Sequence, residues 1–411
     1  MRKNHLYTLI LAFAGLLSVV SCGEDRTHEY LEMTEENQWT YTCMRESYLW
    51  ADGIKSPKRE DFFASTSNFF KTLLASGDKV SFFTDTVSAG SYGLTSTIMR
   101  DPLGENRGDY YALVLYVEPG SPAAQAGLER GNWISSVGGK KLTSSGLKLL
   151  QSGDATDIVR RLVEVDDEGG YSWSEYDTLT ISPSADIASA SVSLDTIYNI
   201  RSGKVGYVVF RNFNNDGLVE HVNEIALGFA AEDITDIVLD LRYCNGGNIE
   251  NTAAVASIFA PQSVVGAPFA KLLDKDSVVT TYSYPEAAVN LSEKRLYIIT
   301  GNMTSGVAEL FTASVNASRG MHEVVTVGAV TAGANVITEK FESPYGFSIN
   351  PAVAQMFISN GNTLQPGGIT PDYSIDELTE LKKVYKLGSE QEYILRNIEY
   401  LIVNGMLPAS L

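Results

Sequence analysis

Three stretches of the chain differ in the spacing of their apolar residues. Residues 34–90 place aromatic and aliphatic side chains at helical intervals, which predicts a helical N-terminal domain. Residues 91–183 contain short β-type runs bounded by Gly and Pro, which predict a β domain. A small, polar segment at 184–197 is interpreted as a linker, and residues 198–411 then alternate buried-type strands with amphipathic helices. That alternation predicts an α/β layer with a largely parallel sheet.

The alternation in the third stretch is regular enough to place its elements. The strands are expected at 205–210, 237–241, 296–300 and 324–327, and the helices at 218–231, 252–259 and 305–316. The first of these helices carries Val222, Ile225 and Phe229 on one face, so we expect that face to pack on the sheet.

The β domain contains two helix signals after its longest apolar run, 110–117. Ser121 suits a helix N-cap, Pro122 the first helical position and Gly127 a left-handed stop. A second helix is expected to open at 154–156. Its apolar stripe would comprise Ile158, Val159 and Leu162.

This order of elements resembles a PDZ domain of the kind associated with bacterial proteases. The resemblance implies that Tyr92-Gly93-Leu94-Thr95 is a carboxylate-binding loop, whose backbone N–H groups hold a peptide's C-terminus while the peptide adds a strand to the sheet edge. Ile158 would contribute to the same peptide-binding groove. The expected partners are therefore polypeptide or protein C-termini. In isolation, Gly93 would indicate only a turn.

Composition narrows the classes of partner and cofactor. The 411 residues contain 31 Lys and Arg against 50 Asp and Glu, a formal charge of −19, so we expect no nucleic-acid partner. Three cysteines cannot form a disulfide framework, and Cys43 and Cys244 are expected to be free thiols among apolar neighbours. No metal-ligand spacing and no phosphate-binding Gly-Lys loop is present in the sequence, so neither a metal nor a cofactor is expected.

The N-terminus has the features of an export signal. A basic start precedes an apolar run at 6–20, which is shorter than the about 20 residues that a spanning helix needs. The position of Cys22 resembles a bacterial lipoprotein signal, which implies removal of 1–21, lipidation of Cys22 and a tether at 22–33. The expected location is the bacterial cell envelope, facing the periplasm or the cell surface, with the lipid as the sole membrane contact. Simple secretion is the alternative.

A glycine pair follows the strand expected at 237–241. The segment Asp240-Leu241-Arg242-Tyr243-Cys244-Asn245-Gly246-Gly247 lies between this strand and a helix. Loops at the carboxyl ends of parallel strands are where α/β sites are built. Bare N–H groups of a glycine pair can point at an anion or a developing oxyanion, so Gly246 and Gly247 are candidate oxyanion donors. The alternative is a plain turn.

Motifs along the whole chain together resemble the tail-specific, or carboxyl-terminal processing, serine protease family. They are Tyr48-Leu49-Trp50, Asp78-Lys79-Val80-Ser81-Phe82, Gly206-Tyr207 with Phe210, Asp240-Leu241-Arg242 with Gly246-Gly247, Tyr345-Gly346-Phe347, Asn350-Pro351-Ala352, and Gly367-Gly368 with Pro371-Asp372. Their order is that of the family over about residues 35–380. The resemblance implies an α/β core of the ClpP/crotonase-like type, a PDZ domain and a helical N-terminal cap. It also implies a serine nucleophile at a helix N-terminus and a lysine base on a later strand.

The sequence departs from the family at both reactive positions. The nucleophile segment reads Thr304-Ser305-Gly306-Val307-Ala308-Glu309, which puts Gly306 where the serine should be. The base segment reads Gly328-Ala329-Val330-Thr331-Ala332-Gly333-Ala334, which puts Ala334 where the lysine should be. One side chain lacks a hydroxyl and the other lacks an amine, so the family's dyad is predicted to be disabled.

Ser305 is the hydroxyl nearest to the nucleophile position. It lies one residue early, about 100° around a helix, and it suits a helix-start residue that satisfies free N–H groups. As possible bases, Lys340 would lie about 20 Å beyond the base position in an extended chain, and no spacing supports His221 or His322. Glu309 fits N-terminal helix capping better than catalysis.

The sequence thus predicts an exported lipoprotein that binds polypeptide C-termini or extended peptides through a PDZ groove and a former active-site cleft. Its role would be that of a non-catalytic binding or regulatory protein. The main alternative is an active serine-type endopeptidase that uses Ser305 and an unrecognised base. A third reading is a structural partner in an envelope complex with an empty PDZ groove.

Overall fold

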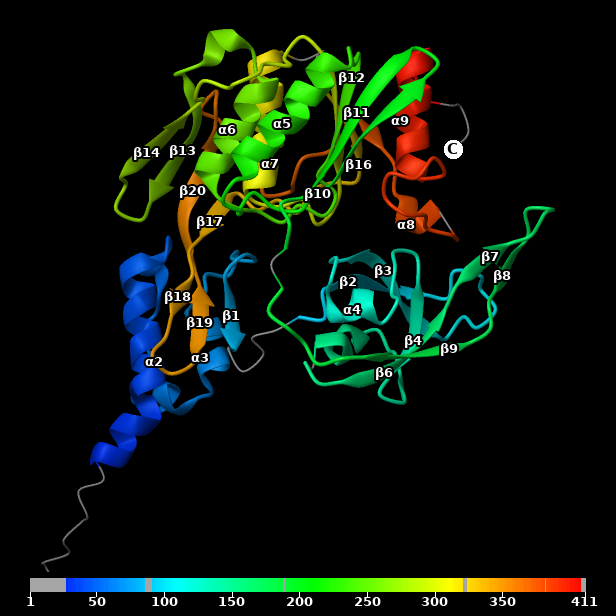
Figure 1. The fold of residues 1–411 in the computed structure, drawn as a ribbon. Helices are drawn as coiled ribbons and strands as arrows, with labels where there is room; N and C mark the ends of the chain where they lie inside the picture. The colour runs from blue at the N-terminus through cyan, green and yellow to red at the C-terminus, as the bar shows by residue number, and fades with distance from the viewer. Residues whose placement is uncertain are drawn as a thin grey trace, which may run out of the picture.

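The computed structural model describes residues 27–85, 91–151, 153–187, 189–320, 324–380 and 382–407. The predicted signal sequence, Cys22 and the first residues of the predicted tether lie outside this range. Figure 1 shows the N-terminal helices beside strands β18 and β19, with the β domain next to them. The α/β core lies above both in this view. In the described part of the chain, no helix is both long and apolar enough to cross a membrane.

The α/β core is built on a six-stranded sheet with the order β10-β11-β12-β15-β16-β21. The first pair is antiparallel and the other four pairs are parallel. The strands are β10 (Val192–Ile200), β11 (Gly203–Phe210), β12 (Asp236–Asp240), β15 (Arg295–Thr300), β16 (Val324–Gly328) and β21 (Tyr373–Ser374). The largely parallel sheet that the βα alternation predicts is therefore confirmed.

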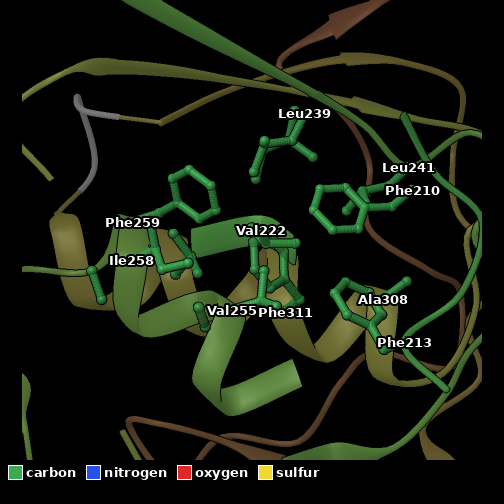
Figure 2. Packing of buried hydrophobic residues seen from close by; sticks show 14 of the residues in the cluster. Phe210, Phe213, Val222, Leu239, Leu241, Val255, Ile258, Phe259, Ala308 and Phe311 are labelled. Carbon is green, nitrogen blue, oxygen red and sulfur yellow. The ribbon is translucent and has the colours of Figure 1, made fainter. Parts of the chain in front are cut away.

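Helices cover both faces of this sheet, as the alternation of apolar side chains along the strands requires. Helices α5 (Leu218–Ala231), α6 (Ile249–Phe259) and α7 (Val307–Arg319) share one apolar cluster with one set of strand residues. Figure 2 shows the centre of that cluster, where Phe213, Val222 and Phe311 come from three different segments. Helix α9 (Tyr393–Asn404) packs on the other face, against residues such as Tyr207 and Val238.

The core begins earlier than the sequence pattern indicates. Strand β10 starts at Val192, so the last residues of the segment interpreted as the 184–197 linker belong to the core sheet, and the boundary at 198 is too late. Their side chains explain the difference, because Leu194 and Ile197 pack on opposite faces of the sheet. The polar residues between them hid this alternation.

Two smaller sheets complete this part of the molecule. One has the order β14-β13-β20-β17 and the other β1-β19-β18. The strands are β1 (Phe82–Asp85), β13 (Pro268–Asp274), β14 (Val279–Ser283), β17 (Val336–Thr338), β18 (Phe341–Glu342), β19 (Phe347–Asn350) and β20 (Ala352–Ile358). Because β17 is the last strand in its sheet, one of its edges has no strand partner among the described residues.

The N-terminal region is helical, as predicted, but it also supplies a strand. Its helices are α2 (Thr27–Ser47), α3 (Thr66–Leu73) and a 3-10 turn at Arg59–Phe63. Phe69 and Phe70 of α3 pack with Phe347 and Ile349 of β19, which pairs with β1. The region is thus closed by residues from the other end of the chain.

The β domain is a sheet with the order β2-β3-β4-β6-β9, with β5 added to β4. The strands are β2 (Leu94–Arg100), β3 (Tyr110–Val117), β4 (Trp133–Val137), β5 (Lys140–Lys141), β6 (Thr156–Arg161) and β9 (Asp177–Ile181), and a separate hairpin joins β7 (Val163–Val165) to β8 (Tyr171–Trp173). Short helix α4 (Pro122–Gln125) begins as predicted, since the Ser121 hydroxyl accepts a hydrogen bond from the Ala124 N–H at 3.1 Å. Gly127 has the expected positive φ of 81°.

The prediction of a helix that begins at 154–156 is wrong. These residues lead into strand β6, and the helical element before it is a 3-10 turn at Gly146–Gln151. Thr156, Ile158 and Val159 favour a strand because they are β-branched, and each pairs with β9. Ile158 is fully buried in the domain core, so it does not line a peptide groove.

Candidate functional site

A cavity of about 1060 Å³ opens where the core meets the N-terminal region, and we call it the central cavity. Its walls include the loops after β12 and β15, the segment before β17, strand β17 itself and residues 75–82. The candidate site residues that line it are Gly246, Gly247, Ser305, Gly306 and Ala334. Residues that lie up to 88 positions apart are thus brought together at one site, as the motifs imply.

Gly306 occupies the N-cap of α7 in a conformation that favours glycine. Its φ is 63° and its ψ is −120°. The turn is fixed on both sides, because the Thr304 hydroxyl donates to the Leu241 carbonyl at 2.7 Å and the Ser305 N–H donates to the Cys244 carbonyl at 3.0 Å. A Cβ built on Gly306 has no heavy atom within 4 Å. A side chain at this position would therefore have free space around it.

The position predicted for the base also has no reactive side chain. Ala334 lies just before β17 and is 6% exposed, so a methyl group stands at this wall of the cavity. The preceding Gly333 has a φ of 78°, and its Cβ position would be 2.3 Å from the Pro366 carbonyl oxygen. The backbone of this loop is thus closely confined.

Glu309 connects the two positions. Its Oε2 accepts hydrogen bonds from the N–H groups of Gly306 (3.1 Å) and Ala334 (2.8 Å), and its Oε1 from Gly333 (2.7 Å) and the Thr331 hydroxyl. Burial raises the pKa of this carboxyl, and the four hydrogen bonds oppose the rise. The capping role predicted for Glu309 is confirmed. The sequence did not predict the contacts of Glu309 with residues 331–334. The available signals were an acidic residue at a helix position expected to be buried and the Gly-containing segment at 328–334.

Ser305 lines the central cavity, but within the described residues its hydroxyl makes no hydrogen bond. The prediction that its side chain satisfies free N–H groups at the helix start is therefore wrong, since Gly306 is the N-cap of α7. Only the backbone carbonyl of Ser305 accepts a hydrogen bond there, from the Ala308 N–H. His221 lies exposed on α5, away from the described cavity lining, and His322 falls outside the described residues. Lys340 does line the cavity, contrary to the distance expected for an extended chain, and its Nζ pairs with Glu342 at 2.7 Å.

The backbone conformation after β12 requires glycine at positions 246 and 247. Gly246 and Gly247 have φ values of 120° and 143°, and a Cβ on Gly247 would be 2.5 Å from the Phe213 nitrogen. Burial raises the pKa of the Cys244 thiol to about 12, although a hydrogen bond from the Gly246 backbone opposes this. In the described chain, the N–H groups of Gly247 and Val307 have no acceptor. Of the two candidate oxyanion donors, Gly247 is therefore the uncommitted one.

The candidate carboxylate loop lies at the open edge of the β domain. Gly93 has a φ of 71°, and a Cβ there would be 2.2 Å from the Ser121 Cβ. Tyr92 is buried, Leu94 begins β2, and Thr95 accepts a 3.4 Å hydrogen bond from Arg211. Since β2 ends its sheet, its outer edge has no strand partner in the described part of the chain. Tyr92 and Gly93 are thus buried just before a free strand edge, and Leu94 and Thr95 are partly exposed residues of that strand. Ile158 lies in the domain core instead.

A buried ionic cluster joins the β domain to the core, and we call it the domain junction. Arg130 of the β domain donates to Glu377 at 2.6 Å, and Arg242 of the core pairs with Asp240 (2.6 Å) and Glu392 (2.7 Å). Sequence reasoning did not find this cluster, because no local pattern links residues so far apart in the chain.

Among the described residues, we find no disulfide and no metal site. Cys43 and Cys244 are both unbridged, as predicted. No group of three or more His, Cys, Asp or Glu side chains arranged to hold a metal occurs in the part of the chain that the structure describes.

Comparison with known protein families assigns the three parts of the chain. The description "Peptidase family S41" matches residues 204–375, "Peptidase S41 N-terminal domain" matches 35–82, and "PDZ domain" matches 113–165. These matches confirm the predicted architecture of cap, PDZ domain and protease-type core.

Comparison with individual proteins gives the same family. A probable CtpA-like serine protease of Staphylococcus aureus is 23% identical over 67% of this chain and 53% of its own length, and one of Staphylococcus epidermidis is 23% identical over 49% and 40%. The chain thus spans about half the length of the curated relatives it matches.

Two solved structures share the fold. A Bacteroides fragilis protein assigned to the S41 proteases has a TM-score of 0.75 and 25% identity, covering 90% of this chain and 97% of its own. The photosystem II D1 C-terminal processing protease has a TM-score of 0.53 and 16% identity, covering 84% and 93%. With its N-terminal domain, PDZ domain and α/β core all matched, the chain belongs to peptidase family S41.

Proposed function

We propose that this protein is an exported, lipid-anchored member of its family that binds polypeptide C-termini and extended peptides without cleaving them. It would act as a binding or regulatory protein of the bacterial cell envelope. The observation that carries the proposal is that Gly306 and Ala334, which the sequence motifs align with the family's serine and lysine, line one cavity. A hydrogen atom and a methyl group can neither attack a carbonyl carbon nor remove a proton.

The PDZ domain supports the first half of this proposal. Strand β2 is an open edge, and the loop before it contains Gly93 in a left-handed conformation. An extended peptide that pairs with β2 would place its terminal carboxylate at this loop. The peptide's main chain would supply affinity, and the contacts of its side chains would supply selectivity.

Strand β17 supports binding in the central cavity. Asn335 accepts a hydrogen bond from the Met356 N–H, and Glu339 donates one to Pro351, so these two residues face β20. Because residues that hydrogen-bond to the neighbouring strand alternate with residues that do not, the N–H and C=O groups of Val336 and Thr338 point away from β20. Both residues line the cavity. An extended peptide in the cavity could therefore pair with β17 as an added strand.

The proposal is tested by labelling with a fluorophosphonate and by assaying hydrolysis of casein and of peptides with free C-termini. We expect neither labelling nor hydrolysis from the chain or from its Ser305→Ala variant. Ser305 and Lys340 line the same cavity, so a Ser305–lysine endopeptidase is the specific rival. Labelling that Ser305→Ala abolishes would establish that rival and overturn the proposal.

A gain-of-function variant serves as the positive control. Gly306→Ser with Ala334→Lys would put the missing hydroxyl and amine into one cavity, and the Gly306 position has open space for a side chain. Hydrolysis by this double variant, and not by either single variant, would show that the scaffold lacks only its reactive groups.

Binding and location are measured separately. Calorimetry with peptides that carry a free or an amidated C-terminus should show binding that needs the free carboxylate at the PDZ groove. No binding, together with recovery of one stable partner from envelope extract, would favour the structural-partner alternative. For the anchor, Cys22→Ser should release the protein from the membrane fraction.

A further inference from the structure

The charges that line the central cavity differ in sign from the chain as a whole. Of the described lining residues, three are charged: Asp78, Lys79 and Lys340. The Asp78 carboxylate is already engaged, because it accepts hydrogen bonds from the Tyr48 hydroxyl (2.8 Å) and from the N–H groups of Val80 (2.9 Å) and Ser81 (3.0 Å). The two lysines therefore set the charge available to a ligand, in a chain whose formal charge is −19.

The lysines stand on two different walls. Lys340 follows β17 directly, two residues beyond Thr338, so it lies in line with the strand edge proposed to receive a peptide. Lys79 belongs to the segment that Asp78 fixes against the N-terminal helices, and its ammonium makes no ion pair within the described residues. Lys340 does pair, with the exposed carboxylate of Glu342, an arrangement that a ligand carboxylate can replace at small cost.

The neutral lining also favours a negative group. Besides the lysines, the cavity presents the amide N–H of Gly247, which has no acceptor in the described chain. The aromatic side chains of Trp50 and Phe82 are 37% and 51% exposed and lie in the same lining. A ligand that fits has an extended main chain, an apolar side chain and one carboxylate.

We propose that the peptide bound in the central cavity presents a carboxylate to Lys79 and Lys340. This inference rests on the proposed function, since it takes the cavity to be a peptide-binding site. The carboxylate can come from an Asp or Glu side chain or from the peptide's C-terminus. In both cases the recognised ligand is an acidic extended peptide.

The test uses four fluorescein-labelled decapeptides of Ala, Ser and Val that carry Glu or Gln near the centre and a free or amidated C-terminus. Binding is followed by fluorescence anisotropy. With amidated ends, which cannot use the PDZ loop, the Glu peptide should bind about three- to tenfold more tightly than the Gln peptide at low salt. Because salt screens exposed charges, the difference should shrink towards one in about 0.5 M salt.

Three variants assign the effect to the cavity. Lys79→Gln and Lys340→Gln should each reduce the Glu preference, and the double variant should abolish it. Lys204→Gln is the matched control, since this lysine lies in β11, does not line the cavity and pairs with Glu232. Thr338→Pro removes an N–H that faces away from β20 and should weaken both peptides equally.

The outcomes separate the two proposals. Equal affinity for Glu and Gln peptides, with binding still lost in Thr338→Pro, would overturn the acidic preference and leave peptide binding in place. A Glu preference that persists in the double lysine variant would also overturn it. If Thr338→Pro changes nothing and no amidated peptide binds, the cavity part of the proposed function fails as well. With Gly93→Ala present to disable the PDZ loop, a gain from the free C-terminus alone would identify the terminus as the carboxylate source.

Discussion

The central cavity and the domain junction both arise from the loop after β12, but they use it in opposite ways. On the junction side, Arg242 makes ion pairs of 2.6 to 3.1 Å with Asp240, Glu377 and Glu392, all of them buried. On the cavity side, Gly246 and Gly247 expose only backbone. Charge is concentrated where two domains meet, and it is absent from Gly306 and Ala334, the two positions that the sequence motifs predict for the reactive groups.

The buried carboxylate of Glu309, beside the cavity, follows the pattern of the junction. Glu309 accepts four hydrogen bonds, three of them from backbone N–H groups on both sides of the cavity. Glu309, like the buried charges of the junction, therefore holds separate segments together. The comparison predicts large losses of stability when such a charge is removed, and changes in binding, with little loss of stability, when the exposed cavity lysines are changed.

Removing the central charge of the junction should have the largest effect. Arg242→Met leaves three buried carboxylates without their shared partner, and we expect the free energy of unfolding to fall by about 3–5 kcal/mol. Urea unfolding measures the loss. The control is Lys204→Met, whose exposed pair with Glu232 should contribute less than about 1 kcal/mol. Equal losses in the two variants would remove the distinction between the junction and the surface.

Removing the carboxylate beside the cavity should have the next largest effect. Glu309→Ala leaves the N–H groups of Gly306, Gly333 and Ala334 without their acceptor, which should lower the free energy of unfolding by about 2–4 kcal/mol. Hydrogen exchange at Gly333 and Ala334 should accelerate more than exchange elsewhere. Glu220→Ala, in the exposed first turn of α5, is the matched control and should change stability by less than about 1 kcal/mol. Unchanged exchange at Gly333 would contradict the role given to Glu309.

The core elements were predictable because their periods are local. The helix at 218–231 appears with the same limits in the structure, and the strands at 205–210 and 324–327 are each extended by one or two residues. The helix expected at 154–156 failed because Ile158 and Val159 fit a strand as well as a helical stripe, and only pairing with β4 and β9 decides between them.

The site was predictable only in part, for a related reason. The motif comparison singled out Gly306 and Ala334, and both residues line one cavity. Their roles as the former nucleophile and base positions stay a prediction. Lys340 reaches the central cavity because of the way the chain turns after β17. The Arg130–Glu377 ion pair joins residues that lie 247 positions apart. Such contacts follow from the assembled fold and leave no local pattern in the sequence.

A smaller effect, on peptide affinity, is expected at the PDZ groove, the second proposed peptide site. Gly93→Ala would put a Cβ 2.2 Å from the Ser121 Cβ at a φ of 71°, so the carboxylate loop must shift. We expect affinity for peptides with free C-termini to fall about tenfold or more, a binding loss of about 1.4 kcal/mol or more, while binding of amidated peptides to the central cavity stays the same. Gly104→Ala is the control, because its φ is 72° and nothing lies within 4 Å of the added Cβ. Equal losses in both variants would mean that backbone strain alone, and not the loop, changes binding.

The smallest effect concerns pH and tests whether the junction charges act as a unit. Burial alone would raise the pKa of Glu377, but Arg242 and Arg130 outweigh it and lower the pKa to about 2, from an ordinary 4.5. Because the folded-state pKa lies below the unfolded value, Glu377 stabilises the fold above about pH 4.5, and this contribution is lost as the pH falls towards 2. Urea unfolding at pH 6, 5 and 4 should show a loss of about 1 kcal/mol by pH 4 that Glu377→Gln lacks, whereas the surface variant Glu60→Gln keeps it.

The neighbouring Glu392 has the opposite sign and decides how this result is interpreted. Burial, reinforced by the Glu377 carboxylate, raises its pKa, so its contribution is fully present below pH 4.5 and is lost as the pH rises. Glu392→Gln should therefore steepen the acid-side loss that Glu377→Gln removes. If both variants flatten the pH dependence of the free energy of unfolding to the same extent, the two carboxylates interact equally with Arg242. The junction would then be a set of independent ion pairs.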